Sequence, residues 1–287
     1  MTDSITAPMF LRSPMFRAAR AVLIRAEVAL PRPAYNVLYR TAFGAYRSSL
    51  EAKYALDLRR RRRNGDWEGV RQGEAVTKAL PYSLVGPSGL EATYTAVFET
   101  VQNNVPGALV ECGVAQGGSS AVMALALRDS GARRKMWLLD SYEGLPDSTS
   151  DDIDPDSGAT GAHVRPLPKG SCLGTYEEVQ TLMHDVIGVP YEQLEMVRGW
   201  FQDTVPDTAP RIGEIAVLRL DGDWYESTRV CLEGLYPSLV QGGLLIIDDY
   251  HSCYGSKRAV HEFLAHQGHE SPELSNDGSG GVLYVKP

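Results

Sequence analysis

The sequence predicts an α/β fold in which a mostly parallel β-sheet carries helices on both faces and a helical arm precedes it. From Ala108 onward, short apolar segments end in turn residues, and a stretch with helical spacing follows each of them. This alternation is typical of βαβ units. A Gly-rich turn follows the first segment, and aspartates follow three of the others. The predicted strands are Ala108–Cys112, Met136–Leu139, Leu194–Val197, Ala216–Leu220 and Leu244–Ile247, with a final hairpin-like pair that includes Gly281–Val285.

The first part of the chain is predicted to be a helical arm. Residues 16 to about 63 carry apolar residues at helical spacing, interrupted by Pro31 and Pro33. The basic run Arg59 to Arg63 is interpreted as a solvated helix end before the turn at Asn64-Gly65. We therefore expect an arm over residues 1–85 and a Rossmann-like domain over residues 86–287.

A long acidic loop is expected at residues 146–171. Its first part, residues 146–161, contains five aspartates between the end of one strand and the next helix. Loops of this length in compact domains are usually functional lids or disordered segments. We expect a mobile lid that orders over the filled site.

Composition and charge exclude several classes of protein. Residues 1–63 hold 13 Lys and Arg against 4 Asp and Glu, whereas the remainder holds 15 against 32, for a net charge of −8. An acidic body argues against nucleic acid as the main partner. The four cysteines have neither zinc-type spacing nor a disulfide pattern, which favours a reducing cytoplasm. No apolar run is long enough to span a membrane.

A Gly-rich turn and a following acid predict a nucleotide-type cofactor site. The turn at Gly113, Gly117 and Gly118 follows a strand and opens an apolar helix, and glycine lets the backbone approach a ligand closely. Asp140 ends the next strand, where an acid accepts hydrogen bonds from ribose hydroxyls. The spacing departs from the dinucleotide fingerprint G-x-G-x-x-G, which weakens a NAD interpretation.

Three aspartates predict a metal site. Asp221 follows one predicted strand, and Asp248 with Asp249 follows the next. Carboxylates at the carboxyl ends of adjacent parallel strands converge on one crevice. Their repulsion is relieved by a hard cation such as Mg²⁺, which prefers oxygen ligands. A helix-capping role is the alternative, and it suits a lone aspartate better than a doublet facing a third acid.

The chain resembles the macrocin O-methyltransferase family, whose members methylate sugar hydroxyls on glycosylated natural products, and more distantly catechol O-methyltransferase. The resemblance runs from about Gly107 to Gly268, and residues 1–85 lie outside it. It implies a class I methyltransferase sheet with S-adenosylmethionine as cofactor. The matching stretches are Glu111–Val114, Gly117–Ser119, Leu139–Pro146, Gly199–Pro206, Leu218–Thr228, Leu235–Pro237 and Gly242–Tyr250.

The resemblance also implies roles for individual residues. Mg²⁺ would lie at Asp221, Asp248 and Asp249. This chain differs from the family at two places near the expected entrance for the acceptor. Ala115-Gln116 stands where family members often have Trp-Arg, and the acidic loop is particular to this chain. The lysine that is the base in catechol methylation is also missing, with Trp224 in its place. The cofactor-binding residues would be Glu111, Gly113 and Ser119 on the loop, Asp140 at the ribose with Ser141 beside it, and Phe201 and Gln202 near the adenine.

The predicted function is Mg²⁺-dependent O-methylation of a sugar hydroxyl. Asp221 is the preferred general base, with His251 and His163 as alternatives. A metal-dependent methyltransferase of phenols or catechols remains open, as does a non-catalytic Rossmann-like binding module. The expected partners are a small hydroxylated acceptor and a second copy of the chain in a homodimer.

Overall fold

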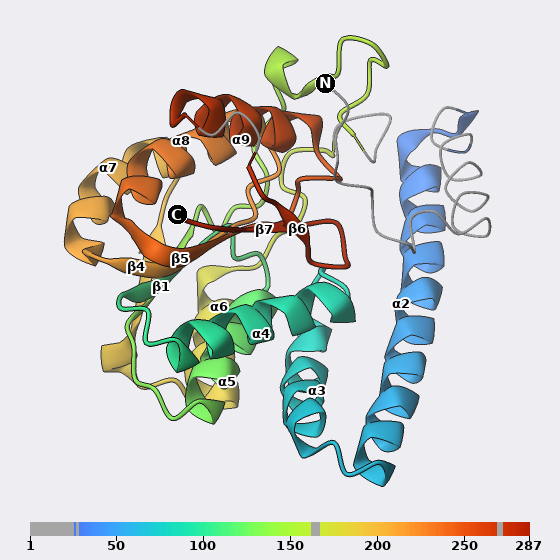
Figure 1. Cartoon of the computed structure of the whole chain (residues 1–287). Helices are drawn as coiled ribbons and strands as arrows, with labels where there is room; N and C mark the ends of the chain where they lie inside the picture. Colours follow the sequence, from blue (N-terminus) through green and yellow to red (C-terminus); the bar gives the residue numbers. More distant parts are fainter. Residues whose placement is uncertain (1–25, 27–28, 162–166, 269–271) are drawn as a thin grey trace.

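The computed structural model describes residues 26, 29–161, 167–268 and 272–287 (Figure 1). Within these residues lies a seven-stranded sheet with the order β3-β2-β1-β4-β5-β7-β6. The first five strands pair in parallel, whereas β7 pairs antiparallel with β5 and with β6. The strands are β1 Ala108–Cys112, β2 Met136–Asp140, β3 Leu194–Arg198, β4 Ile215–Leu220, β5 Leu239–Ile247, β6 Ser275–Asn276 and β7 Val282–Val285.

Helices cover both faces of the sheet (Figure 1). Successive residues of β1 enter different cores: Leu109 packs with α4 and α5, whereas Val110 packs with α7, α8 and α9. This alternation follows from the two-residue period of a strand, and it explains why β1 is apolar except at Glu111. The helices are α4 Pro87–Gln102, α5 Gly118–Asp129, α6 Tyr176–Thr181, α7 Phe201–Ile212, α8 Tyr225–Leu235 and α9 Tyr254–His266.

Two more helices precede the sheet. Helix α2, Arg32–Arg63, stands beside the domain, and α3, Trp67–Ala79, returns to it (Figure 1). Pro33 does not interrupt α2 because it lies in the first turn, where a missing N–H costs nothing. The buried side chains of α3 belong to the same core as α5. Residues 67–79 therefore pack as part of the domain, although the sequence analysis assigned them to the arm.

The basic run ends α2 as the sequence predicts. Arg61 pairs with Asp57 and Glu91, and Arg62 pairs with Glu74. Positive charge in the last turn also complements the helix dipole. The run is therefore accounted for by local ion pairs and a solvated helix end.

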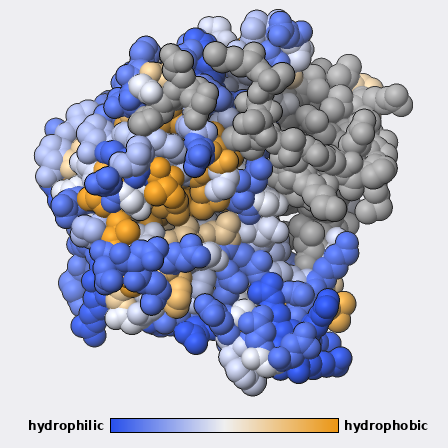
Figure 2. Space-filling view, in the orientation of Figure 1, coloured by the Kyte–Doolittle hydropathy of each residue, from blue (hydrophilic) through white to orange (hydrophobic). Residues whose placement is uncertain are grey.

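One face of the molecule shows how hydrophobic residues are distributed on the surface. The face drawn in Figure 2 is mostly hydrophilic, with hydrophobic residues gathered where Figure 1 places β5, β7 and the C-terminus. Among the residues that the structure describes, no helix is long and apolar enough to cross a membrane.

Candidate active site

A cavity of about 700 Å³ opens at the carboxyl ends of the parallel strands. Residues that follow β1, β2, β4 and β5 line it, because parallel strands bring the turns after them to one edge of the sheet. Nine of the residues predicted to form the site line this cavity: Gly113, Ser119, Asp140, Ser141, Phe201, Gln202, Asp221, Asp248 and Asp249.

The glycine turn after β1 lies directly against the turn after β4. Gly113 has a positive φ of 86°, and a Cβ at this position would overlap the backbone carbonyl of Asp221. The amide of Asp221 donates to the carbonyl of Cys112 at 2.8 Å. Glycine is therefore required for the close approach that brings the turn and the first metal-site carboxylate together.

The start of α5 suits the carboxylate of an amino-acid cofactor. Gly117 is the N-cap residue and offers no side-chain cap, and Gly118 and Ser119 line the cavity. Uncapped N–H groups and the helix dipole favour an anion at this position. Trp200 and Phe201 add aromatic surface to the same cavity. These features fit S-adenosylmethionine.

Asp140 fixes the conformation of the glycine turn through hydrogen bonds. Its carboxylate accepts hydrogen bonds from the amides of Val114 at 2.6 Å, Ala115 at 3.1 Å and Tyr142 at 2.6 Å. Burial raises its pKa, and these three bonds oppose that rise. Asp140 thus shapes the turn in addition to its predicted contact with the ribose.

We expect Asp140→Ala to weaken binding of S-adenosylmethionine measured by calorimetry. Removal of hydrogen bonds to a charged group costs about 1–3 kcal/mol, or roughly 5- to 150-fold in Kd. Glu143→Ala, which removes an exposed acid outside the cavity, is the matched control. Equal affinities for the two variants would contradict a role for Asp140 in the cofactor site.

The three predicted metal ligands do converge. One carboxylate oxygen each from Asp221, Asp248 and Asp249 can be chosen so that all lie within 4.8 Å of one another. Burial and the neighbouring acids raise the pKa values of Asp248 and Asp249 well above the usual range. An all-oxygen donor set of this kind fits Mg²⁺.

Arg219 was not among the residues predicted to form the site, although it contacts two of them. It is fully buried at the end of β4, and its guanidinium donates to Asp221 at 2.7 Å and to Asp248 at 2.6 Å. Burial alone lowers its pKa, but the surrounding carboxylates raise it overall. Part of the charge compensation that we assigned to a metal therefore comes from the chain itself. The sequence of β4 did contain a signal, since Arg219 is the one charged residue in an otherwise apolar strand.

Glu111 lies behind the cavity, which it does not line. It pairs with Arg219 at 3.3 Å and accepts a short hydrogen bond from Ser120 in the first turn of α5. Burial raises its pKa to about 7, although Arg219 and Ser120 oppose the rise. Glu111 therefore connects α5 to Asp221 and Asp248 through Arg219. Its predicted direct contact with the cofactor stays a prediction.

Asp223 is a second residue that the predicted site omitted. It lines the cavity, and its backbone amide donates to Asp249 at 2.9 Å. Burial and the charges of Asp221 and Asp248 raise its pKa to about 8. Its motif position, two residues after Asp221, was the available signal.

His251 does not reach the site. The ring of His251 is hydrogen-bonded to Asn276 at 2.8 Å, and His251 does not line the cavity. His163 lies outside the described residues. The geometry does not support His251 as a base.

Residues from the described part of the acidic loop line the cavity, and this part is anchored to the start of α8. Asp152 is buried and accepts from the amide of Tyr225 at 2.6 Å, and Trp224 donates to the carbonyl of Pro146 at 3.1 Å. A further bond joins Tyr254 to Thr160 at 3.0 Å. The residue that replaces the catechol-type lysine is thus an anchor for the loop. Movement of the loop on ligand binding stays a prediction.

Comparison with known proteins decides the family. The family described as macrocin-O-methyltransferase matches residues 24–285, so the match also covers most of the arm, which the sequence resemblance left out. The chain belongs to the macrocin O-methyltransferase family. It is therefore an S-adenosylmethionine-dependent O-methyltransferase, and its fold is that of class I methyltransferases.

Curated relatives and a solved structure agree with this membership. The chain is 37% identical to the 8-demethyl-8-(2,3-dimethoxy-alpha-L-rhamnosyl)-tetracenomycin-C 4'-O-methyltransferase of Streptomyces olivaceus, over 70% of this chain and 75% of the relative. It is 39% identical to the demethyldecarbamoylnovobiocin O-methyltransferase of Streptomyces niveus, over 69% and 73%. The solved O-methyltransferase NovP is 36% identical, with a TM-score of 0.61 over 71% of this chain and 82% of NovP.

Proposed function

We propose that this protein methylates a sugar hydroxyl of a natural-product glycoside and that a bound Mg²⁺ assists the transfer. The observation that carries the proposal is the shared cavity, where the glycine turn and Asp140 adjoin three converging carboxylates. The names of the macrocin family and of the rhamnosyl-tetracenomycin methyltransferase support a glycoside acceptor.

Asp221, Asp248 and Asp249 would hold the cation. Arg219 takes one oxygen of Asp221 and one of Asp248, so each carboxylate keeps a second oxygen for a metal. Bound there, Mg²⁺ would act as a Lewis acid on the acceptor hydroxyl. The chain itself would position the two substrates, with the cofactor on the glycine turn and the acceptor in the cavity beside the anchored loop.

We further propose Asp223, rather than Asp221, as the group that accepts the hydroxyl proton. Asp221 is held by Arg219 at 2.7 Å, and a guanidinium opposes protonation of its partner. Asp223 lines the same cavity, and none of the described cations forms an ion pair with it within 4.0 Å. The geometry therefore favours Asp223 over the base that the sequence suggested.

The proposed function is tested by transfer of labelled methyl groups onto a panel of glycosides, free sugars and phenols. We expect transfer to glycosides, and loss of at least about 100-fold in rate for Asp223→Asn, since general-base catalysis contributes roughly 10²–10⁴-fold. Asn tolerates the positive φ of 57° at this position, so the backbone should be kept. Transfer to phenols alone would overturn the sugar assignment, and binding of cofactor without transfer to any acceptor would favour a non-catalytic module.

A further inference from the structure

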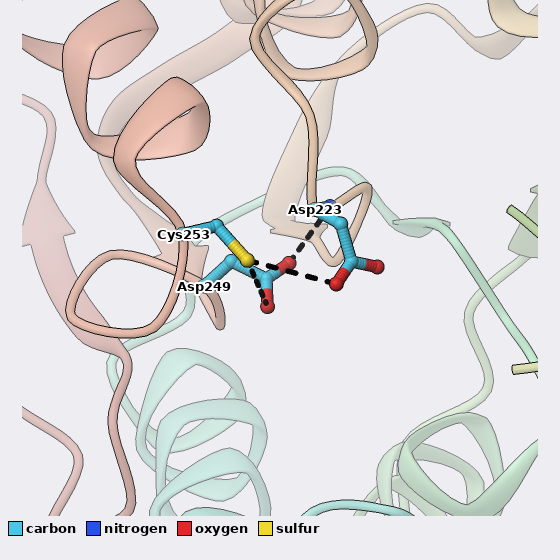
Figure 3. Close-up of side chains that lie close together, drawn as sticks. All are labelled: Asp223, Asp249 and Cys253. Carbon is cyan, nitrogen blue, oxygen red and sulfur yellow. Dashed lines mark hydrogen bonds between the residues drawn. The ribbon is translucent and has the colours of Figure 1, made fainter. Parts of the chain in front are cut away.

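A second group of metal ligands lies beside the predicted Mg²⁺ site. Asp223 follows β4, Asp249 follows β5, and Cys253 is the N-cap residue of α9. Figure 3 shows the thiol of Cys253 beside the carboxylate of Asp249, with dashed lines from the sulfur to an oxygen of Asp249 and to an oxygen of Asp223. One ligand atom from each of the three residues lies within 4.8 Å of the others, and all three residues line the cavity.

The distances in this group match those around a tetrahedral cation. The Sγ atom of Cys253 lies 3.7 Å from Asp223 Oδ1 and 3.9 Å from Asp249 Oδ1. In a tetrahedral zinc site, bonds of about 2.3 Å to sulfur and 2.0–2.2 Å to oxygen place these ligand atoms roughly 3.5–3.7 Å apart. Shifts of a few tenths of an ångström would therefore close the site around a metal.

We propose that Asp223, Asp249 and Cys253 bind a thiophilic divalent cation such as Zn²⁺. Sulfur is a soft ligand that selects zinc or cobalt over magnesium, whereas the neighbouring set of Asp221, Asp248 and Asp249 offers oxygen alone. Three protein ligands leave the fourth position open toward the cavity for water. On binding, the thiol releases its proton to solvent and coordinates as the thiolate.

Occupation of this site inhibits methyl transfer. Asp249 belongs to both groups, so a zinc ion held by Cys253 removes one ligand from the Mg²⁺ site and also engages Asp223. This inhibitory role rests on the proposed function, whereas binding of the cation does not. The two parts are therefore tested separately.

Binding is tested by titrating the reduced protein with Co²⁺, without cofactor or acceptor, and recording absorption. A thiolate bound to cobalt gives a charge-transfer band that carboxylates do not produce, so we expect this band in the wild-type protein. Cys253→Ser should abolish it and weaken Co²⁺ affinity at least about 10-fold, because loss of even an outer partner of a ligand costs roughly 10–100-fold. Serine is a better N-cap than cysteine, so the variant should fold.

Two further variants make the test specific. Cys172→Ser removes the other thiol that lines the cavity and should leave the band unchanged. Asp223→Asn keeps the thiol and should keep the band with a weaker affinity. The proposal is overturned if saturating Co²⁺ gives no charge-transfer band, or if Cys253→Ser gives the same band and affinity as the wild type.

Inhibition is tested by adding Zn²⁺ to the methyl-transfer assay at a fixed Mg²⁺ concentration. We expect inhibition of the wild type, and at least about a 10-fold higher Zn²⁺ concentration for half-inhibition of Cys253→Ser, in proportion to the lost affinity. Equal inhibition of both proteins would overturn the inhibitory role even if cobalt binds. A protein that binds cobalt but transfers no methyl group would contradict the proposed function and leave the metal site standing.

Discussion

Removal of divalent cations should reduce methyl transfer to the acceptor at least about 100-fold, and Mg²⁺ should restore it. A Lewis acid contributes several kcal/mol of transition-state stabilisation, and about 1.4 kcal/mol corresponds to a tenfold change in rate. The physical reason lies in Asp221, Asp248 and Asp249, whose converging oxygens form a donor set for a hard cation. Rates are measured after treatment with a chelator and again after Mg²⁺ is added.

Asp249→Asn tests the same site within the chain. The variant keeps one oxygen ligand but loses a charge, so Mg²⁺ affinity and transfer rate should both fall, while calorimetric binding of S-adenosylmethionine stays nearly unchanged. Asp207→Asn, an exposed aspartate on α7 that does not line the cavity, is the matched control. Full activity of the chelator-treated enzyme would show that these three acids do not act through a metal.

Arg219→Met should destabilise the metal-free protein by about 3–5 kcal/mol, because removal of one partner leaves buried charges uncompensated. This corresponds to a drop on the order of 10 °C in Tm. Addition of Mg²⁺ should raise the Tm of the variant more than that of the wild type, since the cation then supplies the missing positive charge beside Asp221 and Asp248. Thermal unfolding with chelator and with Mg²⁺ measures both effects.

Arg229→Met is the control for the loss of an arginine in itself. Arg229 also pairs with two acids, Glu226 and Glu233, but on the surface of α8. Exposed pairs contribute roughly 0–1 kcal/mol, so its Tm should change little and should not gain extra sensitivity to Mg²⁺. If Arg219→Met has the same Tm as the wild type in the presence of chelator, the guanidinium of Arg219 does not neutralise Asp221 and Asp248.

The strands could be predicted from the sequence because parallel strands covered by helices on both faces are mostly apolar. β1 agrees with its predicted bounds, and β2 and β3 extend one residue further, to Asp140 and Arg198. β5 was predicted from Leu244 but begins at Leu239. Its first half includes Gln241 and Gly242, which are exposed, so the sequence carries no apolar run that would mark it as a strand.

The α/β fold, the glycine turn, Asp140 and the three converging aspartates could be read from the chain alone, because they lie at the ends of strands and parallel strands end at one edge. The balance of those charges depends on tertiary contacts. Arg219 comes from within a strand, and its reach to Asp221 and Asp248 depends on the register of β4 against β5. The meeting of Asp223 and Cys253, thirty residues apart, likewise depends on how α9 packs over the end of the sheet. Hydrophobic patterns in the sequence indicate which residues face the core. Contacts between turns depend instead on how helices and strands that are distant in the sequence pack together.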